Sequence, residues 1–532
     1  MSTTRTPGRA TVDATRAWAE RFRAEGRSPG AFRVLGRTNL TVSLLGFGGY
    51  RVHHRVPEHR EALTAAFAAG VNLLDTSSNY TDGGSELLVG EILAEEIAKG
   101  SVRREEIVTV SKVGYVQGQN LEIVERARKD RDPFPEVVEY MEGCWHCIHP
   151  RFLADQLRRS MERMGLAHLD VYLLHNPEYY FSDLKQRGSL RTPDEIKDAR
   201  EVFYRRVRDA FEFLHRAVGE GTIGAFGISS NTFGHDADDP EFVSLERCLS
   251  IASELGAAGA FAVAQAPLNL YEGGPYLEKN QREGAESFLG LAKEAGIGVL
   301  INRPLNAATH RGMLRLADVR READADVEAK IERALAEINA VEVEFDREMS
   351  DWFPDALGTG EERKRPFLWA VQLGESYRGV QGSEHWRQIF SQVVQPQVQG
   401  NLQILSRAIA RAPNGPDDRD RARRWNEWTE RFIKAINDVL HLVGVYQTNR
   451  SADVAADVRQ RLADAWPDAV PDSVRSASLS RQAIAAVAGL EGVTCVLNGM
   501  RTPDYVEDSV GVMRLPDLEN VGRVFRAFAA AG

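Results

Sequence analysis

The chain has 532 residues, of which 43% are hydrophobic and 27% are charged, and its formal net charge is −11. A chain of this length is too long to fold around one small hydrophobic core, so we expect a large domain with an insertion, or several domains. The negative charge argues against nucleic acid or an anionic membrane as the main partner, and no apolar run reaches the roughly 20 residues that a membrane span needs.

The first 30 residues are expected to be an extension that carries a short amphipathic helix. The segment MSTTRTPGRATVDATRAWAERF is basic and rich in threonine, but it contains Asp13 and Glu20. It also lacks the apolar centre of a secretion signal. We therefore expect residues 1–30 to be an extension and not a targeting signal.

Four cysteines are too few and too scattered for a disulfide framework, and they fit a reducing cytoplasm. Two of them, Cys144 and Cys147, form a Cys-x-x-Cys pair that His149 follows. No second Cys/His pair stands at zinc spacing, so we interpret the segment as a plain loop and assign no metal. A metal or redox site is the alternative.

Eight short apolar runs, separated by helical stretches, are the main fold signal. Continuous apolar character is typical of parallel strands that helices cover on both faces. Eight strand-plus-helix units predict an α/β fold of the (β/α)8 barrel type, and FRVLGRTNLTVS in front of them predicts a small β-hairpin across the barrel bottom. The runs are 42–50, 72–75, 107–112, 169–175, 223–231, 261–265, 297–303 and 493–499.

Polar residues stand at the ends of these runs, where the active site of such a barrel lies. The exits of the second, third and fourth runs carry Asp75 with Tyr80, then Lys112, then His175. Each alone has an ordinary structural explanation, such as a helix cap for Asp75, a packing aromatic for Tyr80 or a solvated amine for Lys112. Their conjunction at adjacent exits predicts one catalytic site.

These four residues suit proton donation to a carbonyl. A phenol has a pKa of about 10, too high for an efficient acid at neutral pH, and an adjacent ammonium such as that of Lys112 lowers it. Asp75 is expected to hold the lysine by an ion pair. His175 is expected to orient the carbonyl and to donate a hydrogen bond to its oxygen. A nicotinamide cofactor would have to deliver the hydride.

At this point the residues resemble the aldo/keto reductase family. The segments GVNLLDTSSNYTDGGSELLVGEIL, LGRTNLTVSLLGFGGYRV and LDVYLLHNPE are similar to family motifs, over roughly residues 32–307 and 480–530. The resemblance implies that Tyr80 is the general acid/base, with Asp75, Lys112 and His175 as the rest of the tetrad. It also implies an NAD(P)(H)-dependent oxidoreductase that interconverts a carbonyl and an alcohol.

The resemblance further implies a cofactor site. Tyr505 and Ser509 replace the usual glutamine and asparagine of the adenine segment. Arg501 favours NADP(H) through a 2′-phosphate, and NAD(H) stays possible. The residues implied to bind the cofactor are Gly48, Gly49, Tyr50, Ser229, Ser230, Asn231, Gln265, Arg303, Pro304, Leu305, Gly499, Arg501 and Asp508.

An insertion of some 170 residues, 308–479, interrupts the barrel after the seventh run, so the barrel is expected to comprise 31–307 and 480–532. Its segments read as helical and contain six of the eight tryptophans. A segment so rich in large apolar residues predicts a folded α-helical insertion with its own core. Because it leaves a strand's carboxyl end, we expect it on the catalytic face, as a lid, a pocket wall or an oligomer contact.

Other function classes fit the same residues less well. A metal-dependent hydrolase would want His-x-His on the first strand, whereas His53 and His54 are adjacent and lie beyond it. The alternative that stays open is a non-catalytic or slow cofactor-binding regulatory or scaffold protein whose insertion binds a partner. The expected partner is a small carbonyl or alcohol substrate, with a homo-oligomer possible and no nucleic acid or membrane.

Overall fold

The computed structural model describes residues 5–309, 312–322, 326–359, 363–411 and 415–530. The chain forms two compact units. The barrel unit comprises Met1–Ala307 and Arg461–Gly532, and the helical unit comprises Ala308–Gln460. Among the described residues, no helix is both long enough and apolar enough to cross a membrane.

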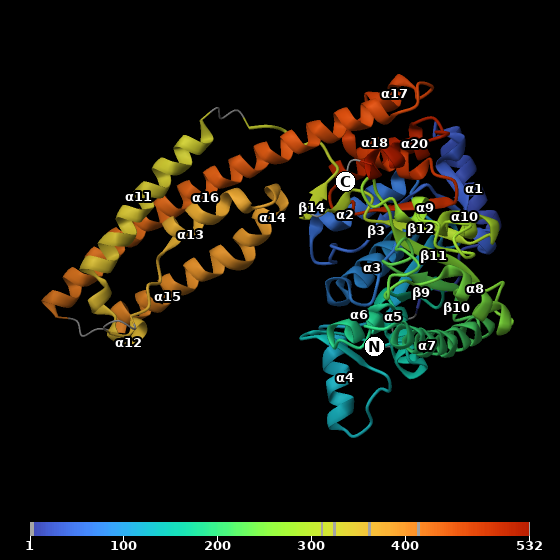
Figure 1. Cartoon of the computed structure of the whole chain (residues 1–532), viewed down its shortest axis with the longest axis horizontal. Helices are drawn as coiled ribbons and strands as arrows, with labels where there is room; N and C mark the ends of the chain where they lie inside the picture. The colour runs from blue at the N-terminus through green and yellow to red at the C-terminus, as the bar shows by residue number, and fades with distance from the viewer. Residues whose placement is uncertain (1–4, 310–311, 323–325, 360–362, 412–414, 531–532) are drawn as a thin grey trace. The chain divides into compact units, whose positions relative to one another are not determined.

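The predicted (β/α)8 barrel is confirmed. Eight parallel strands close on themselves, each paired with its two neighbours, and they coincide with the eight apolar runs (Figure 1). In barrel order they are β3 (Leu45–Gly48), β4 (Leu73–Asp75), β5 (Val108–Val113), β9 (Leu169–His175), β10 (Ile223–Ser229), β11 (Phe261–Pro267), β12 (Gly298–Asn302) and β15 (Val493–Asn498).

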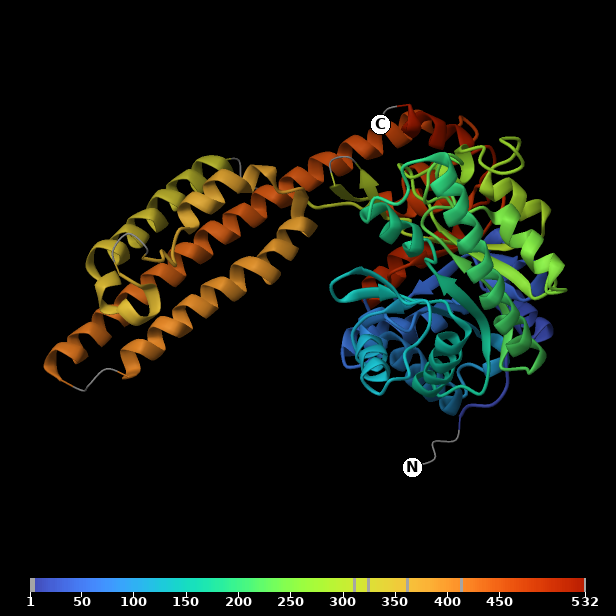
Figure 2. The same cartoon turned by 60° about the horizontal axis from the view of Figure 1, so that its bottom comes forward.

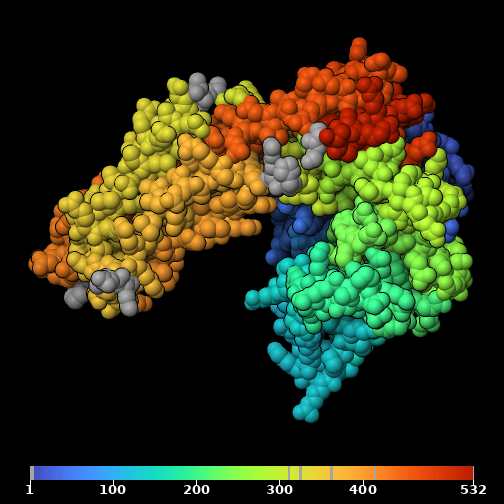
Figure 3. Space-filling model, in the orientation of Figure 1, coloured from blue at the N-terminus to red at the C-terminus, as the bar shows by residue number. Residues whose placement is uncertain are grey.

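Helices separate these strands along the chain. Glycines in the left-handed region cap α3 and α5, as Gly100 (φ 75°) and Gly165 (φ 61°) show. The helices of the barrel unit after the hairpin are α2 (Pro57–Ala68), α3 (Gly84–Lys99), α4 (Gln119–Lys129), α5 (Pro150–Met164), α6 (Tyr179–Gln186), α7 (Pro193–Gly219), α8 (Leu245–Glu254), α9 (Gly274–Leu277), α10 (Phe288–Glu294), α17 (Asp472–Arg475), α18 (Leu479–Ala488), α19 (Pro503–Val510) and α20 (Gly522–Ala529). In Figure 3, α4 (cyan) projects from the surface of the barrel unit.

The N-terminal hairpin is present, with β1 (Phe32–Val34) antiparallel to β2 (Thr41–Ser43). Its Leu35 and Val42 are fully buried, and they form one cluster with residues of the barrel interior such as Leu73. Helix α1 (Val12–Ala24) precedes the hairpin, and its buried Trp18 donates a hydrogen bond to the carbonyl of Gly70. The hairpin therefore completes the core at the amino-terminal end of the strands.

The prediction of a plain loop at Cys144 and Cys147 is wrong. Residues Cys144–His146 form strand β8, which lies between β6 (Tyr115–Val116) and β7 (Val138–Met141) in an antiparallel sheet. Strand pairing with two neighbours fixes this segment, although its sequence lacks an apolar run. All four cysteines are free, and the described residues contain no cluster of metal-ligating side chains.

The helical unit has its own core, as the tryptophans predicted. Trp425, Trp428 and Phe432 are buried on α16, and the Trp428 and Phe432 rings stack with centroids 5.0 Å apart. Figures 1 and 2 both show α11 and α15 running alongside α16. The helices are α11 (Val327–Glu348), α12 (Pro354–Leu357), α13 (Trp369–Ser376), α14 (Gly382–Ile389), α15 (Gln395–Arg411) and α16 (Pro416–Ala465), and a short hairpin, β13 (Asn306–Thr309) with β14 (Gly312–Arg315), lies ahead of them in the sequence.

The helical unit ends earlier than the expected boundary at residue 479. It ends at Gln460, inside α16, and the residues that follow pack with the barrel unit. Trp466 shows the reason, because it is buried and its indole Nε1 donates to Oε1 of Gln482 on α18 at 3.1 Å. The sixth tryptophan of the expected insertion therefore belongs to the barrel unit.

Candidate active site

The barrel brings together the four residues that the sequence singled out at the strand exits. Asp75 ends β4, Lys112 lies in β5 and His175 ends β9, on three neighbouring strands. Tyr80 begins the turn Tyr80–Gly83 that follows β4. Parallel strands place their carboxyl ends at one edge, which is why residues 100 positions apart in sequence converge here.

Lys112 is the centre of this cluster. Its side chain is fully buried, and its ammonium lies 2.7 Å from Asp75 Oδ2, 3.1 Å from Tyr80 Oη and 2.9 Å from the carbonyl oxygen of Thr76. A lysine ammonium has three N–H donors. Each of them therefore has an acceptor, and the ammonium joins the carboxylate of Asp75 to the phenol of Tyr80.

A second layer of hydrogen bonds holds Asp75. Its Oδ1 accepts from Gln265 Nε2 at 2.9 Å, and Gln265 Oε1 accepts from Ser229 Oγ at 3.0 Å. Gln265 and Ser229 were both expected to contact a cofactor. In the structure they also link the ends of β11 and β10 to the carboxylate that anchors Lys112.

The electrostatics of the site differ in part from the expectation. Burial raises the pKa of Tyr80, and Lys112 opposes this shift without reversing it. Burial also acts to lower the pKa of Lys112, but Asp75 and Tyr80 outweigh it and the net shift is upward. At neutral pH the site therefore holds a charged lysine and a protonated phenol.

His175 lies beside the other three residues. Its ring meets Tyr80 edge-on with centroids 5.7 Å apart, and its side chain is buried. Burial, and then the nearby Lys112, hold the pKa of His175 well below its usual value, so the imidazole is neutral. His175 Nδ1 lies 3.0 Å from Ser77 Oγ.

Two contacts of His175 were not found from the sequence. His146 on β8 donates from Nε2 to the backbone oxygen of His175 at 2.7 Å, and the Tyr115 ring meets the His175 ring edge-on at 4.6 Å. A Cβ on Gly114 would lie 2.4 Å from His146 Nε2, so only glycine leaves room for this contact. The sequence offered one signal for His146. It is a histidine, a residue type that often has a chemical function, inside the segment that was interpreted as a plain loop.

The expected residues after β3 lie at the same end of the barrel. The amide of Gly49 donates to the carbonyl of Asp75 at 2.8 Å, and a Cβ there would lie 2.4 Å from Ser85 Oγ. Gly48 ends β3 and is partly exposed. Tyr50 is 62% exposed, and its ring meets Tyr80 edge-on at 5.2 Å. Tyr50 therefore forms an exposed edge of the cluster.

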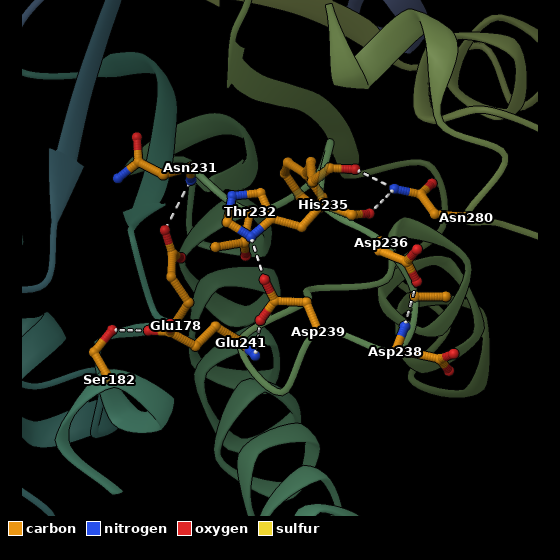
Figure 4. A network of polar contacts seen from close by, with 12 residues as sticks. Glu178, Ser182, Asn231, Thr232, His235, Asp236, Asp238, Asp239, Glu241 and Asn280 are labelled. Atoms are coloured by element: carbon orange, nitrogen blue, oxygen red, sulfur yellow. Dashed lines mark hydrogen bonds and ion pairs between the residues drawn. The ribbon is translucent and has the colours of Figure 1, made fainter. Parts of the chain in front are cut away.

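The buried carboxylate of Glu178 holds the backbone of the segment that follows β10. Glu178 Oε1 accepts the amide of Asn231 at 2.7 Å, and Ser230 beside it is buried (Figure 4). Glu178 is 3% exposed, and burial raises its pKa to about 7. This carboxylate, which the sequence did not single out, holds the backbone amide of Asn231, a residue expected to bind a cofactor.

The segment after β12 carries the next expected group. Arg303 adopts φ 53° and pairs with Glu272 at 2.9 Å, while Pro304 and Leu305 beside it are buried. Within the described part of the chain, the buried atoms Asn302 Oδ1 and Arg303 Nε have no hydrogen-bond partner. The strand end thus presents an unsatisfied acceptor and an unsatisfied donor.

The last expected residues follow β15. Gly499 is exposed with open space at its Cβ position, and Arg501 is partly exposed. Asp508 instead points to α18, where its carboxylate accepts from Ser478 Oγ at 2.8 Å and pairs with Arg481 at 3.2 Å. Its carboxylate is thus engaged within the protein.

A family model, curated proteins and solved structures match this chain. The model of the aldo/keto reductase family matches residues 44–326. A putative voltage-gated potassium channel subunit beta of Schizosaccharomyces pombe is 27% identical over 28% of this chain and 37% of its own length. The NADH-specific methylglyoxal reductase of Escherichia coli is 24% identical over 30% and 49%. The chain thus spans half or less of the length of these two relatives.

A crystal structure of an aldo/keto reductase from Klebsiella pneumoniae with NADP and acetate aligns with 51% of this chain and 68% of its own length, at 17% identity and a TM-score of 0.31.

Proposed function

The chain belongs to the aldo/keto reductase family, and from this premise we propose that it is an NAD(P)(H)-dependent oxidoreductase that interconverts a carbonyl and an alcohol. The observation that carries the proposal is the position of Lys112 Nζ between Asp75 Oδ2 and Tyr80 Oη, at 2.7 and 3.1 Å. Tyr80 is the general acid in reduction and the general base in oxidation. Lys112 stabilises the phenolate as it forms, because Asp75 keeps the ammonium charged and in place.

The residues at the mouth fit a dinucleotide cofactor. Asn302 Oδ1 and Arg303 Nε supply the unsatisfied acceptor and donor, and the space at Gly499 is open. Ser229, Ser230, Asn231 and Gln265 would hold the nicotinamide end. When bound, the cofactor supplies or accepts the hydride. We propose NADP(H) with Arg501 at its 2′-phosphate, and NAD(H) as the alternative, since one relative is an NADH-specific enzyme.

Titration of the protein's fluorescence with NADPH and, separately, with NADH tests cofactor binding. Tyr80→Phe is expected to leave the cofactor dissociation constant nearly unchanged and to lower turnover by about 10²-fold or more, because it removes general acid catalysis. A matched control is Tyr276→Phe, which removes a phenol hydroxyl on α9 from a residue with no expected role in catalysis or cofactor binding, and it is expected to keep most of the activity. Parental turnover in Tyr80→Phe would contradict the assignment.

A second candidate function rests on one relative, which is named as a putative voltage-gated potassium channel subunit beta. In that case the chain binds cofactor without appreciable turnover, and the helical unit binds a protein partner. Two results together would favour this function. The parent protein binds cofactor but turns over no carbonyl or alcohol, and Tyr80→Phe binds cofactor as the parent does. The four free cysteines support a reducing compartment such as the cytoplasm for either function.

A further inference from the structure

A long stretch of the helical unit carries no charged side chain. Residues 388–406 contain no Asp, Glu, Lys or Arg, although 27% of the whole chain is charged. The stretch lies in one helical run, 382–411, in which α14, the π-helical turn Phe390–Val394 and α15 follow one another without a break. Figure 2 shows α15 along one edge of the helical unit. The stretch therefore has one side toward the core of the unit and another side away from it.

The inner side of α15 belongs to the core of the helical unit. Val394, Val398 and Leu405 are buried in that core. Trp425 on α16 also reaches this side, because its indole Nε1 donates to Ser406 Oγ at 3.1 Å. These contacts account for one side of the helix and leave the other side without a role in the core.

The outer side of α15 carries exposed apolar and small residues. Val393 and Ile404 are 44% and 55% exposed. Gln397, Gly400 and Ala408 are exposed or partly exposed, and together these five residues recur every three or four positions, which places them on one face of the helix. We call them the α15 stripe. A Cβ on Gly400 would meet no atom of the described residues within 4 Å, so the middle of the stripe is open.

Exposed sides of other helices in the same unit carry charges. Arg431 and Arg424 on α16 pair with Glu344 and Glu348 on α11, at 2.6 and 2.8 Å. The solvent-facing side of a helix normally carries such charges, whereas the centre of a contact between proteins is depleted of them. The α15 stripe has the composition of a contact, so we infer that a second protein surface covers it.

The charge of the chain favours a second copy of this chain as that surface. The formal net charge is −11, so two copies repel each other wherever their charged surfaces approach. Residues 388–406 bring no charge from either copy, and two copies can meet there without this repulsion. A strongly acidic or basic partner would find no opposite charge on the stripe, and it would gain no electrostatic complementarity.

The order of residues along the stripe is self-complementary. In a two-fold symmetric contact, a residue that faces a second residue on the other copy is matched by the reverse pair. Two antiparallel α15 helices centred between Gln397 and Gly400 place Val393 opposite Ile404 of the second copy. Gln397 then lies opposite Gly400 of the second copy, so a long side chain faces a residue that has none. Each pairing occurs twice, and no residue of like charge is brought together.

We propose that the α15 stripe joins two copies of the chain in an antiparallel, two-fold symmetric dimer. Centred in this way, residues 389–408 of the two copies overlap over about 30 Å, and a helix is about 10 Å wide. Each copy then contributes a face of about 300 Å², compared with about 800 Å² in a standard interface. The dimer is therefore reversible, with an expected Kd of about 10–100 µM. It does not depend on the proposed function.

Analytical ultracentrifugation of the full-length chain, at concentrations below and above this range, tests the proposal. We expect the average mass to rise with concentration from that of one chain toward that of two chains. The same association is expected at low and high salt, because no ion pair crosses the stripe. A single chain at all concentrations would overturn the proposal. Assembly beyond two chains, or dissociation in high salt, would also overturn it.

Two isoleucines provide a matched pair of variants. Ile404→Glu brings a carboxylate into the contact twice and is expected to raise the Kd about tenfold or more, because each charge loses water without gaining a partner. Ile433→Glu changes an isoleucine that is 42% exposed on α16, outside the stripe, and is expected to keep the parental Kd. Both variants are expected to keep the parental circular dichroism, since both side chains are exposed. Equal Kd values for the two variants would overturn the placement of the contact on α15.

A second substitution in the same chain tests the antiparallel register. Val393→Lys combined with Ile404→Glu places opposite charges across both halves of the contact and is expected to recover most of the lost affinity. The two positions are about 16 Å apart along one helix, so they do not pair within one copy. Gln397→Lys combined with Ile404→Glu is the control and is expected to recover less, because Gln397 lies opposite Gly400. No recovery in the first combination, or equal recovery in the two, would overturn the register.

Discussion

Replacing Lys112 by methionine removes one charge of a fully buried pair and keeps a side chain of similar length. Lys112 is 0% exposed at its side chain and Asp75 is 5% exposed. Removal of one partner of a buried pair leaves the other charge uncompensated and costs about 3–5 kcal/mol. Gln265 Nε2 still donates to Asp75 at 2.9 Å, which places the expected loss near the lower end of that range.

Hydrogen exchange of the amides in β4 and β5 measures this loss within the barrel unit alone. A global melt is less suitable, because a chain with two compact units is not expected to unfold in one two-state transition. A loss of about 3 kcal/mol corresponds to exchange that is faster by about a hundredfold, since 1.4 kcal/mol is a tenfold change. Exchange at the parental rate would refute the conclusion that Asp75 and Lys112 are a buried ion pair.

A double variant separates stability from chemistry. In Asp75→Asn with Lys112→Met no buried charge is left, and we expect most of the lost stability to return. Turnover is expected to stay low in both variants, because neither holds an ammonium beside Tyr80. Recovery of turnover together with stability would mean that Lys112 serves only the fold.

Glu178→Gln is expected to stabilise the barrel at neutral pH, because burial raises the pKa of Glu178 from 4.5 to about 7. Between these two values the folded state keeps a proton that the unfolded chain releases, so the parent loses stability as the pH rises from 4.5 to 7. The variant has no such proton and does not lose this stability. Hydrogen exchange measured across this pH range gives the difference. Glu342→Ala removes the acceptor of two amides at the start of α13 and is expected to cost about 1–3 kcal/mol, read from exchange of α13. Gly90→Ala would place a Cβ 2.3 Å from the carbonyl oxygen of Met164, so we expect a lower melting temperature, and an unchanged one would contradict the close approach of α3 and α5.

The barrel could be predicted because its strands are buried on both faces. All seven residues of Leu169–His175 are buried, and the apolar run in the sequence has the same bounds. Asp170 and His175 are charged or titratable exceptions, and Asp170 is paired with buried Arg104 at 2.9 Å. A continuous apolar run of this kind signals a parallel strand whatever its neighbours are.

The small sheet and the surroundings of His175 could not be predicted in the same way. Strand β7 alternates between buried and exposed residues, and β8 is three residues long. Their structure depends on pairing with each other and with β6, which no local pattern encodes. The convergence of Asp75, Tyr80, Lys112 and His175 was predicted from strand order, but the contact of His175 with Ser77 depends on side-chain distances that strand order does not give.

The pKa of Tyr80 was mispredicted for a related reason. The expectation that Lys112 lowers it treated the two groups as a pair in isolation. Burial of the phenol is the larger effect in the structure and raises the pKa. Proximity in a fold can be read from strand exits, whereas the degree of burial depends on every neighbouring side chain.

The interrupted barrel has a consequence for the order in which the chain can fold during synthesis. Strand β15 pairs with β12 on one side and with β3 on the other, and it begins only at Val493. The helical unit, which has its own core, is complete in sequence at Gln460. The edges of β3 and β12 therefore stay unpaired while the whole helical unit leaves the ribosome. A nascent chain stalled before Val493 is expected to expose these two edges to chaperones or to aggregation.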